Sequence, residues 1–369
     1  MMAILKLIFE IRLKINAKGV FIMAVERILF GNMPDGREVY EYVITNSSEC
    51  SARIITLGAT LRSFTMKDKT GAERDVLLCF DSVKDCLELS DYQGVIVGPV
   101  CNRIGGAEIE INGEKYALTA NEKGITCLHS GGELGLSVWK AIVTDSDSVE
   151  FSYTQADGAH GFPGEKEVKV IYRLGDDNKL HIKYEAVSDK DTYLNFTNHA
   201  YFNLNGYDNG TILNHTLTID ADLITEVDEN SIPTGRNIPV EDTAFDFRSE
   251  RVIGKDIDDS HIQLAYTGGY DHNFCINGYD GSLKKIACAK GDLSGIEMNV
   301  YTTLPGVQFY AGNFLKGIVG KNGVPMEKRS GFCLETQFYP DTPHHSDFPS
   351  CFYKAGEKYI SETVYEFMV

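Results

Sequence analysis

The sequence predicts an all-β protein folded as a large antiparallel β-sandwich. From Arg27 onward, apolar and polar residues alternate with a period of two far more often than they repeat with helical spacing. Turn residues separate these alternating runs at short intervals, and the runs continue to the end of the 369-residue chain. Because many antiparallel strands in one unit must stack to bury their apolar faces, we expect two packed sheets.

Two hairpins are the clearest elements. In AEIEINGEKYAL, isoleucine alternates with glutamate before Asn112 and Gly113, a pair that favours the positive φ angles of a type I′ turn. In EVKVIYRLGDDNKLHIKYEAV, two alternating runs flank a turn at residues 175–178, and the alternation places His181 on the outward face. Helices are expected only in SVKDCLEL and in part of IGKDIDDSHIQLAY.

The predicted domain organisation is simple. The chain has no internal repeat, low-complexity tract or Pro- or Ser-rich linker, so residues 23–369 are expected to form a single domain. Residues 1–22 form an N-terminal extension in which basic residues interrupt short apolar runs and no small-residue cleavage site appears. This extension is either a dispensable segment or a targeting signal, and its sequence does not decide between the two.

Composition limits the partners of the chain. A formal net charge of -18 and a pI near 4.9 argue against binding to nucleic acid or to an anionic membrane surface. No apolar run reaches the roughly 18 residues of a membrane helix. The nine cysteines are scattered and form no C-x-x-C pair, which argues against a disulfide framework or a zinc site and favours a reducing, cytoplasmic location. A neutral small molecule held by hydrogen bonds and aromatic faces is the expected partner.

Five segments place hydrogen-bonding side chains in strand-like or turn-like surroundings. They are CNRIGG, ITCLHSGG, TNHAYFNL, GYDHNF and CLETQFYPD, which carry Asn102, Arg103, His129, His199, Asp271 and Glu335. Taken singly, each has an ordinary structural explanation, such as packing for His199 or a surface ion pair for Arg103. The sequence also lacks the glycine-rich nucleotide signatures and the G-x-S-x-G elbow.

Glu335 and His199 form the most suggestive pair. The neighbours of Glu335 in the sequence are apolar, namely Phe332, Leu334, Phe338 and Tyr339. Desolvation by such residues raises the pKa of a carboxylate and makes it a better base. An imidazole titrates near neutrality and is the natural partner acid. By contrast, DTPHHSD is not expected to bind metal, because His344 and His345 cannot both point into one site from an extended strand.

The order and wording of these segments resemble the galactose mutarotase family, the aldose 1-epimerases. The resemblance covers more than 300 residues in nine ordered segments, including GVIVGPVCNRIGGAEIEINGEKYAL, LHSGGELGLSVW, NFTNHAYFNLNG, GYDHNF and LETQFYPDTPHHSDFPSCFYKAGEKY. It implies a β-supersandwich that needs no metal, nucleotide or other cofactor. The implied reaction interconverts the α and β anomers of free hexoses such as galactose and glucose, in a monomer or homodimer.

The resemblance also implies roles for single residues. Glu335 would be the general base, His199 the general acid, and His129 a hydrogen-bonding assistant near the ring oxygen. The sugar hydroxyls would be held by Asn102, Arg103, Tyr201, Asp271 and Gln308. Trp139, the single tryptophan, is expected in the core.

Two alternatives stay open. A mutarotase-like enzyme for a phosphorylated or acidic sugar would need further Arg or Lys residues at the site. A non-catalytic sugar-binding module of the same fold would be expected to lack the acid or the base. The chain also departs from the usual family wording at Pro99, Cys101 and Leu136, near the expected cleft, which leaves substrate preference open.

Overall fold

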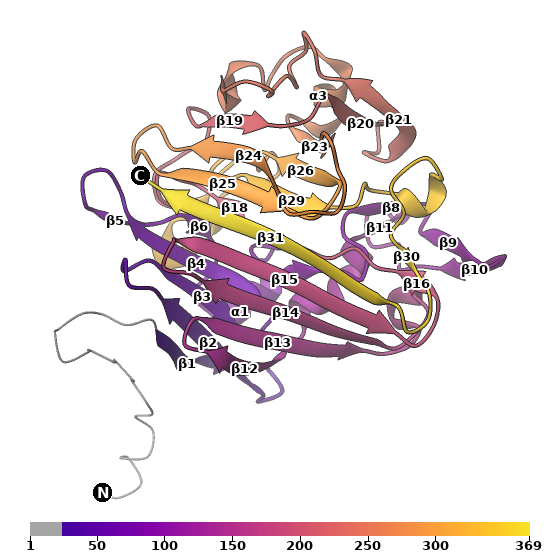
Figure 1. Cartoon of the computed structure of the whole chain (residues 1–369), viewed down its shortest axis with the longest axis horizontal. Helices are drawn as coiled ribbons and strands as arrows, with labels where there is room; N and C mark the ends of the chain where they lie inside the picture. The colour runs from indigo at the N-terminus through magenta and orange to yellow at the C-terminus, as the bar shows by residue number, and fades with distance from the viewer. Residues whose placement is uncertain (1–23) are drawn as a thin grey trace, which may run out of the picture.

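The computed structural model describes residues 24–369, so the predicted extension at residues 1–22 and the predicted domain start at Met23 lie outside the described residues. The largest sheet has nine strands (Figure 1). In spatial order these are β12 (Lys140–Asp145), β13 (Ser148–Gln155), β14 (Lys166–Leu174), β15 (Lys179–Ser188), β31 (Lys358–Met368), β25 (Glu297–Thr302), β24 (Lys284–Lys290), β19 (Thr216–Ile219) and β22 (Arg251–Val252).

Two five-stranded sheets accompany it. One contains β1 (Ala24–Asn32), β2 (Glu38–Thr45), β3 (Ser51–Ile55), β4 (Thr60–Lys67) and β5 (Glu73–Asp75). The other, called here the site sheet, contains β21 (Pro233–Pro239), β20 (Leu223–Val227), β23 (Asp271–Cys275), β26 (Gly306–Tyr310) and β29 (Cys333–Gln337). Neighbouring strands in both sheets pair antiparallel, as they do in the large sheet.

Short elements connect these sheets. The two-stranded pairs are β6 (Leu77–Leu78) with β18 (Tyr201–Phe202), β7 (Ile96–Val97) with β17 (Thr197–Asn198), β8 (Arg103–Gly105) with β11 (Thr126–Leu128), β9 (Glu108–Ile111) with β10 (Glu114–Ala117), β16 (Thr192–Tyr193) with β30 (Phe352–Tyr353), and β27 (Ile318–Val319) with β28 (Pro325–Met326). The α-helices are α1 (Val83–Glu88), α2 (Glu133–Leu136) and α3 (Ile262–Thr267).

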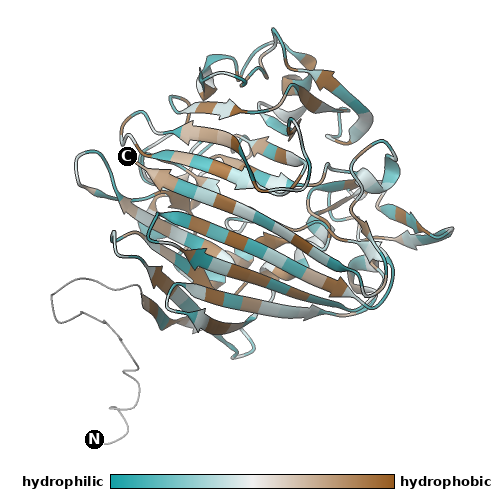
Figure 2. Ribbon diagram, viewed as in Figure 1, coloured by the Kyte–Doolittle hydropathy of each residue, from teal (hydrophilic) through white to brown (hydrophobic). Residues whose placement is uncertain are grey.

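One continuous apolar core joins the three larger sheets. Figure 2 shows apolar and polar residues alternating along the long strands of the nine-stranded sheet, as a period of two requires for a sheet with one buried face. Phe367 of β31 stacks on Phe64 of β4, with ring centroids 4.0 Å apart. Tyr365, also from β31, donates its hydroxyl proton to the carbonyl of Leu334 in the site sheet at 3.1 Å. The large sheet therefore packs against both smaller ones, which confirms the predicted all-β sandwich.

The predicted local elements are confirmed. Asn112 and Gly113 have φ angles of 54° and 81°, as the predicted type I′ turn requires. His181 lies half-buried on the outer face, where its Nδ1 is 2.8 Å from Glu362 Oε1. Both predicted helices form, and Ser82, the residue before α1, caps that helix by accepting from Asp85 N–H. The short helix α2 lies outside the two segments in which helices were expected.

Two further sequence expectations have structural counterparts. All nine cysteines, which lie within the described residues, are free thiols. Between residues 24 and 369, none of the helices has the length and apolar character that crossing a membrane requires.

The site sheet ends at β29, and a side chain covers the main chain just beyond that strand. The amide of Asn195 donates its Nδ2–H to Phe338 O at 3.2 Å and accepts from Phe338 N–H at 2.9 Å. Asn195 thereby replaces the backbone partner that a further strand would provide.

Gly94 joins three segments near the end of β17. Its N–H donates to His199 O at 2.8 Å and its carbonyl accepts from Asn198 Nδ2 at 2.7 Å. At a φ of +72°, an added Cβ would lie 2.2 Å from the carbonyl oxygen of Leu61. We expect Gly94→Ala to lower the free energy of unfolding by about 1 to 3 kcal/mol, measured by urea denaturation.

Gly71→Ala is the matched control for this prediction. Gly71 also has a positive φ, of +85°, but an added Cβ would meet nothing within 4 Å. The loss at Gly94 should therefore exceed the loss at Gly71. If both variants lose the same free energy of unfolding, the contact with Leu61 adds nothing to the cost of placing alanine at a positive φ angle.

Candidate active site

A cavity of about 400 Å³ opens at one face of the site sheet. It is lined by all of the predicted site residues except Gln308, namely Asn102, Arg103, His129, His199, Tyr201, Asp271 and Glu335. These residues come from segments that are far apart in the sequence, and the fold brings them to one place.

Strand register explains why the site sheet is polar on the cavity side. Asp271 of β23, Tyr310 of β26 and Cys333 of β29 lie directly opposite one another, and the next row is Asn273, Gln308 and Glu335. Register partners share one face of a sheet, so these two rows point the same way, whereas the intervening residues His272, Phe309 and Leu334 point into the core.

This register corrects one detail of the sequence interpretation. Glu335 is only 2% exposed, as its apolar surroundings predicted, but Leu334 lies on the opposite face and does not surround the carboxylate. The residues that follow Glu335 on its own face, such as Gln337, are polar. Burial of the carboxylate in the cavity lining accounts for its desolvation, and Leu334 does not contribute to it.

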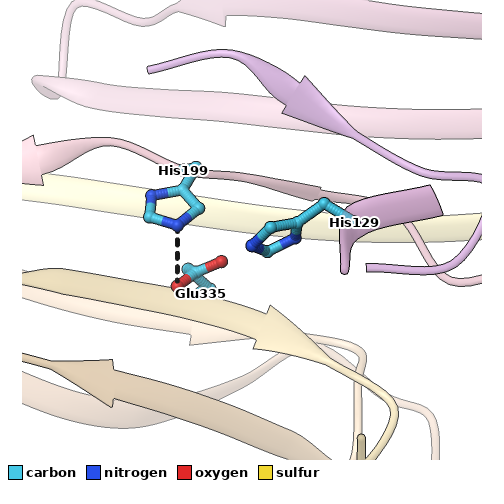
Figure 3. A group of neighbouring side chains, drawn as sticks. All are labelled: His129, His199 and Glu335. Atoms are coloured by element: carbon cyan, nitrogen blue, oxygen red, sulfur yellow. Dashed lines mark ion pairs between the residues drawn. The ribbon is translucent and has the colours of Figure 1, made fainter. Parts of the chain in front are cut away.

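Glu335 and His199 face each other across the base of the cavity. The Nε2 atom of His199 is 3.6 Å from Oε1 of Glu335 (Figure 3). Burial raises the pKa of Glu335 well above its usual value, with a further rise from Asp271 opposed by Arg103. Burial also lowers the pKa of His199 to about 4. Both shifts favour the uncharged forms, which are the protonated carboxyl group and the neutral imidazole.

His129 is fixed by a reciprocal pair of hydrogen bonds with Asn102. The N–H of His129 donates to Asn102 O at 3.0 Å, and the N–H of Asn102 donates to His129 Nδ1 at 3.1 Å. Both residues have positive φ angles, of 49° and 62°. Because a main-chain N–H can only donate, Nδ1 of His129 carries no proton and its Nε2–H is a donor toward the cavity. Burial lowers the pKa of His129 well below its usual value, so the ring is neutral.

Arg103 and Asp271 form the charged wall of the cavity. The guanidinium of Arg103 donates to both carboxylate oxygens of Glu122, at 2.9 Å each, and its Nη1 lies 3.7 Å from Asp271 Oδ2. Gln308 donates its Nε2–H to Asp271 Oδ1 at 2.7 Å. Gln308 lies in the same row of the sheet as Glu335 and supports Asp271, and it is not among the residues that line the cavity.

Two aromatic rings hold the imidazoles in place. Tyr201 stacks on His199 with ring centroids 5.1 Å apart, and its hydroxyl donates to the carbonyl of Asp91 at 3.1 Å. Tyr92, which the sequence interpretation missed, contacts both imidazoles, with centroids 4.6 Å from His129 and 5.8 Å from His199. Tyr92 has a φ of 64°, a conformation that a tyrosine in SDYQG does not reveal.

Sequence reasoning missed other cavity residues as well. Glu122 and Tyr310 line the cavity, but nothing in their sequence context distinguishes Glu122 from an ordinary loop carboxylate or Tyr310 from an ordinary aromatic residue of a strand. The sequence feature that could have revealed Glu122 is Arg103 in the motif CNRIGG, because a buried arginine needs a carboxylate partner.

The positions that depart from the family wording lie close to the cavity. Leu136 is half exposed and lines a smaller pocket of about 190 Å³ that shares Tyr92 with the main cavity. Cys101 is buried, with Sγ 3.6 Å from Gln337 Oε1. Trp139 is buried and donates its Nε1–H to Leu134 O at 2.9 Å, which confirms the predicted core position.

Three cavity side chains are of the types that bind metal ions. His129, His199 and Glu335 offer ligand atoms within 4.8 Å of one another. A metal-binding histidine donates its second ring N–H to an acceptor, whereas Nδ1 of His129 accepts from Asn102. Its Nε2 therefore carries the proton that a metal ion would have to displace, and the donor set does not suit a metal.

The histidine pair in DTPHHSD corrects another expectation. Residues 342–344 form a 3-10 turn and not an extended strand, so both rings approach one carboxylate. Nδ1 of His344 is 2.7 Å from Asp341 Oδ1, and Nε2 of His345 is 3.2 Å from Asp341 Oδ2. Asp341 also accepts from Gly105 N–H at 2.9 Å, so this cluster secures the strand that begins with Arg103.

Comparison with known proteins identifies the relatives of this chain. The family model for aldose 1-epimerase matches residues 40–366. The chain is 41% identical over 352 residues to the galactose mutarotase of Bos taurus, covering 94% of this chain and 99% of that protein. It is 34% identical over 340 residues to the aldose 1-epimerase of Escherichia coli K12, covering 91% and 97%. The crystal structure of galactose 1-epimerase from Lactobacillus acidophilus superposes with a TM-score of 0.82 at 25% identity, covering 94% and 99%.

The sandwich and its cavity thus define a galactose mutarotase-like fold. With a family match that spans most of its length, the chain belongs to the aldose 1-epimerase family. The resemblance inferred from the sequence segments is therefore confirmed.

Proposed function

We propose that this protein is a mutarotase, which interconverts the α and β anomers of free hexoses such as galactose and glucose. The observation that carries the proposal is the pairing of Glu335 with His199 at 3.6 Å, at the base of a hexose-sized cavity in a member of the aldose 1-epimerase family. Opening a hemiacetal requires one group that accepts the proton of the C1 hydroxyl and another that protonates the ring oxygen.

The proton balance follows from this pair. In the reactive state Glu335 is ionised and His199 is protonated. Glu335 takes the proton from the C1 hydroxyl, and His199 gives its Nε2 proton to the ring oxygen as the bond from C1 to that oxygen breaks. Rotation about the C1–C2 bond turns the aldehyde, and the two groups reverse their roles to close the other anomer.

Burial favours the ring-opening direction of this transfer. The reactive state holds two charges in a desolvated site, and the transfer neutralises both of them. The pKa of Glu335 is raised by burial and the pKa of His199 is lowered by burial, so the neutral pair matches the ring-open state. Positioned acid and base groups typically contribute about 10² to 10⁴-fold to a rate.

The remaining cavity residues suit the hydroxyls of a neutral sugar. Arg103, Asn102 and Asp271 offer charged and amide groups, and His129 offers its Nε2–H. Tyr201 contributes its ring, since its hydroxyl is bonded to main chain. We assign Gln308 to positioning Asp271, because it donates a hydrogen bond to that carboxylate.

The charge of the cavity favours a neutral sugar over a phosphorylated one. Arg103 already pairs with Glu122 and Asp271, and the other Lys or Arg side chain among the described lining residues is the exposed Lys123. A phosphate needs cations that are not already neutralised by carboxylates.

Polarimetry with freshly dissolved sugars tests the proposal. The protein is expected to accelerate the mutarotation of α-D-galactose and α-D-glucose, and to leave glucose 6-phosphate at its spontaneous rate. Binding of a sugar without acceleration would establish a sugar-binding module instead. A preference for glucose 6-phosphate would establish an epimerase of acidic sugars.

We further propose that residues 23–369 form one domain that works in the cytoplasm as a monomer or homodimer. The shared core extends from Tyr42 to Phe367, which supports one folding unit. The free thiols are typical of a reducing compartment. Limited proteolysis and size-exclusion chromatography test the domain and the oligomeric state.

Glu122→Gln is predicted to weaken substrate binding. Glu122 holds the guanidinium of Arg103 in a bidentate pair, and a hydrogen bond between charged groups is worth about 1.5 to 3 kcal/mol. KM for galactose should rise by about 10-fold or more while kcat changes little. Glu108→Gln, which removes an exposed carboxylate paired with Lys115, should leave both constants unchanged.

A further inference from the structure

The proposed proton transfer sets a requirement for Nδ1, the ring nitrogen of His199 that does not face Glu335. When Nε2 gives its proton to the ring oxygen, the ring becomes neutral, and it must keep its second proton on Nδ1 so that Nε2 can take the first one back. The opposite neutral tautomer would place a proton on Nε2 and could not accept one there. Whatever contacts Nδ1 therefore decides whether the ring can complete the cycle.

The atom facing Nδ1 is a sulfur. Sγ of Cys333 lies 3.5 Å from Nδ1 of His199, within the range of a hydrogen bond to sulfur. Cys333 is on β29, two residues before Glu335 on the same face, so one strand supplies both partners of the imidazole. Cys333 is fully buried, which leaves water no access to this contact.

We propose that Cys333 is a positioning residue whose sulfur accepts the Nδ1–H of His199 and keeps that proton in place while Nε2 exchanges its own proton with the sugar. The catalytic role in this inference rests on the proposed mutarotase function, whereas the contact between Cys333 and His199 does not depend on it. Nε2 of the same ring is directed at Glu335, so Nδ1 is the ring nitrogen that the sulfur contacts.

The two cavity histidines then have opposite tautomers. His129 is held with its proton on Nε2, because Asn102 N–H donates to its Nδ1. His199 is held with its proton on Nδ1. His129 is therefore a permanent donor that cannot exchange protons through Nε2, and His199 alone is free to work with Glu335.

A sulfur acceptor also suits the acidity that the reaction needs. A carboxylate at this position would stabilise the charged imidazolium and weaken it as an acid. Sulfur accepts only weakly, so it orients the ring without stabilising its charge. Protonated His199 is then a strong enough acid for a weakly basic ring oxygen.

Nitrogen NMR of histidine-labelled protein tests the inference directly. The neutral form of His199, assigned by its absence in His199→Gln, is expected to carry its proton on Nδ1, whereas His129 is expected to carry its proton on Nε2. A proton on Nε2 of neutral His199 would overturn the proposal. The measurement uses the free protein, so it stands whether or not polarimetry shows mutarotation, and a negative polarimetry result would refute the function alone.

Substitution of Cys333 gives the second test. Cys333→Ala should remove the Nδ1–H preference of His199 and lower kcat by about 2- to 10-fold, as expected for loss of a hydrogen bond, with KM nearly unchanged. Cys333→Ser, whose hydroxyl also accepts, should restore the tautomer and most of kcat. Cys351→Ala makes the same change at another fully buried cysteine and should alter neither. An unchanged tautomer in Cys333→Ala would overturn the proposal.

Discussion

Glu335→Gln is expected to lower kcat for galactose mutarotation by about 10² to 10⁴-fold while KM stays within a few fold. The amide fills the same space and hydrogen-bonds sugar hydroxyls, but it cannot take the proton of the C1 hydroxyl. The ion pair of Arg103 and Asp271, which we propose holds the sugar hydroxyls, is untouched by the change. Polarimetry over a range of sugar concentrations separates the two constants.

The matched control is Glu362→Gln. Glu362 forms a partly buried Glu–His pair, with Oε1 2.8 Å from His181 Nδ1, on the outer face of the nine-stranded sheet. This variant removes a carboxylate from an imidazole without touching the cavity, so kcat should be unchanged. If Glu335→Gln keeps the wild-type kcat, another group must be the base.

The rate should follow a bell-shaped pH profile set by one shared proton. Below a pH of about 4, the pKa to which burial lowers His199, the pair takes up a second proton and no base remains. At high pH the pair loses its only proton, at a pKa that burial of Glu335 raises well above that of an ordinary carboxyl group. Beyond either limb kcat/KM falls about tenfold for each pH unit.

His199→Gln tests the assignment of these limbs. This variant should lose about 10²-fold or more in kcat, and the limb near pH 4 should disappear because it belongs to the imidazole. His181→Gln is the control, since His181 pairs with Glu362 on the outer face of the nine-stranded sheet, away from the cavity lining. A wild-type rate that is constant from pH 3 to pH 10 would contradict a proton-sharing pair.

Local pattern was sufficient to predict much of the fold. Period-two alternation determines which face of a strand is buried, so hairpins such as the one turning at Asn112 were predictable. The site residues Glu335 and His199 were predictable only through their resemblance to a family, because nothing local shows that residues 136 positions apart in sequence meet (335 minus 199).

The errors arose where side-chain direction depends on register or on turn geometry. The register of β26 and β29 decides that Leu334 points away from the face that bears Glu335, and the pairing of β23 with β26 brings Gln308 into contact with Asp271. The 3-10 turn at residues 342–344 decides that His344 and His345 share one carboxylate. Tyr92 was missed because its position depends on a positive φ angle in a loop.

The amide of Asn195 has a consequence for how firmly the segment after β29 is held. β29 is the last strand of its sheet, and Phe338 follows it directly. Asn195 and Phe338 are both buried, so water does not replace the amide as the partner of the N–H and carbonyl of Phe338. Deamidation of Asn195 would replace the donor of this pair by a carboxylate oxygen, leave the buried carbonyl of Phe338 without a donor, and destabilise the segment that follows the reactive carboxylate.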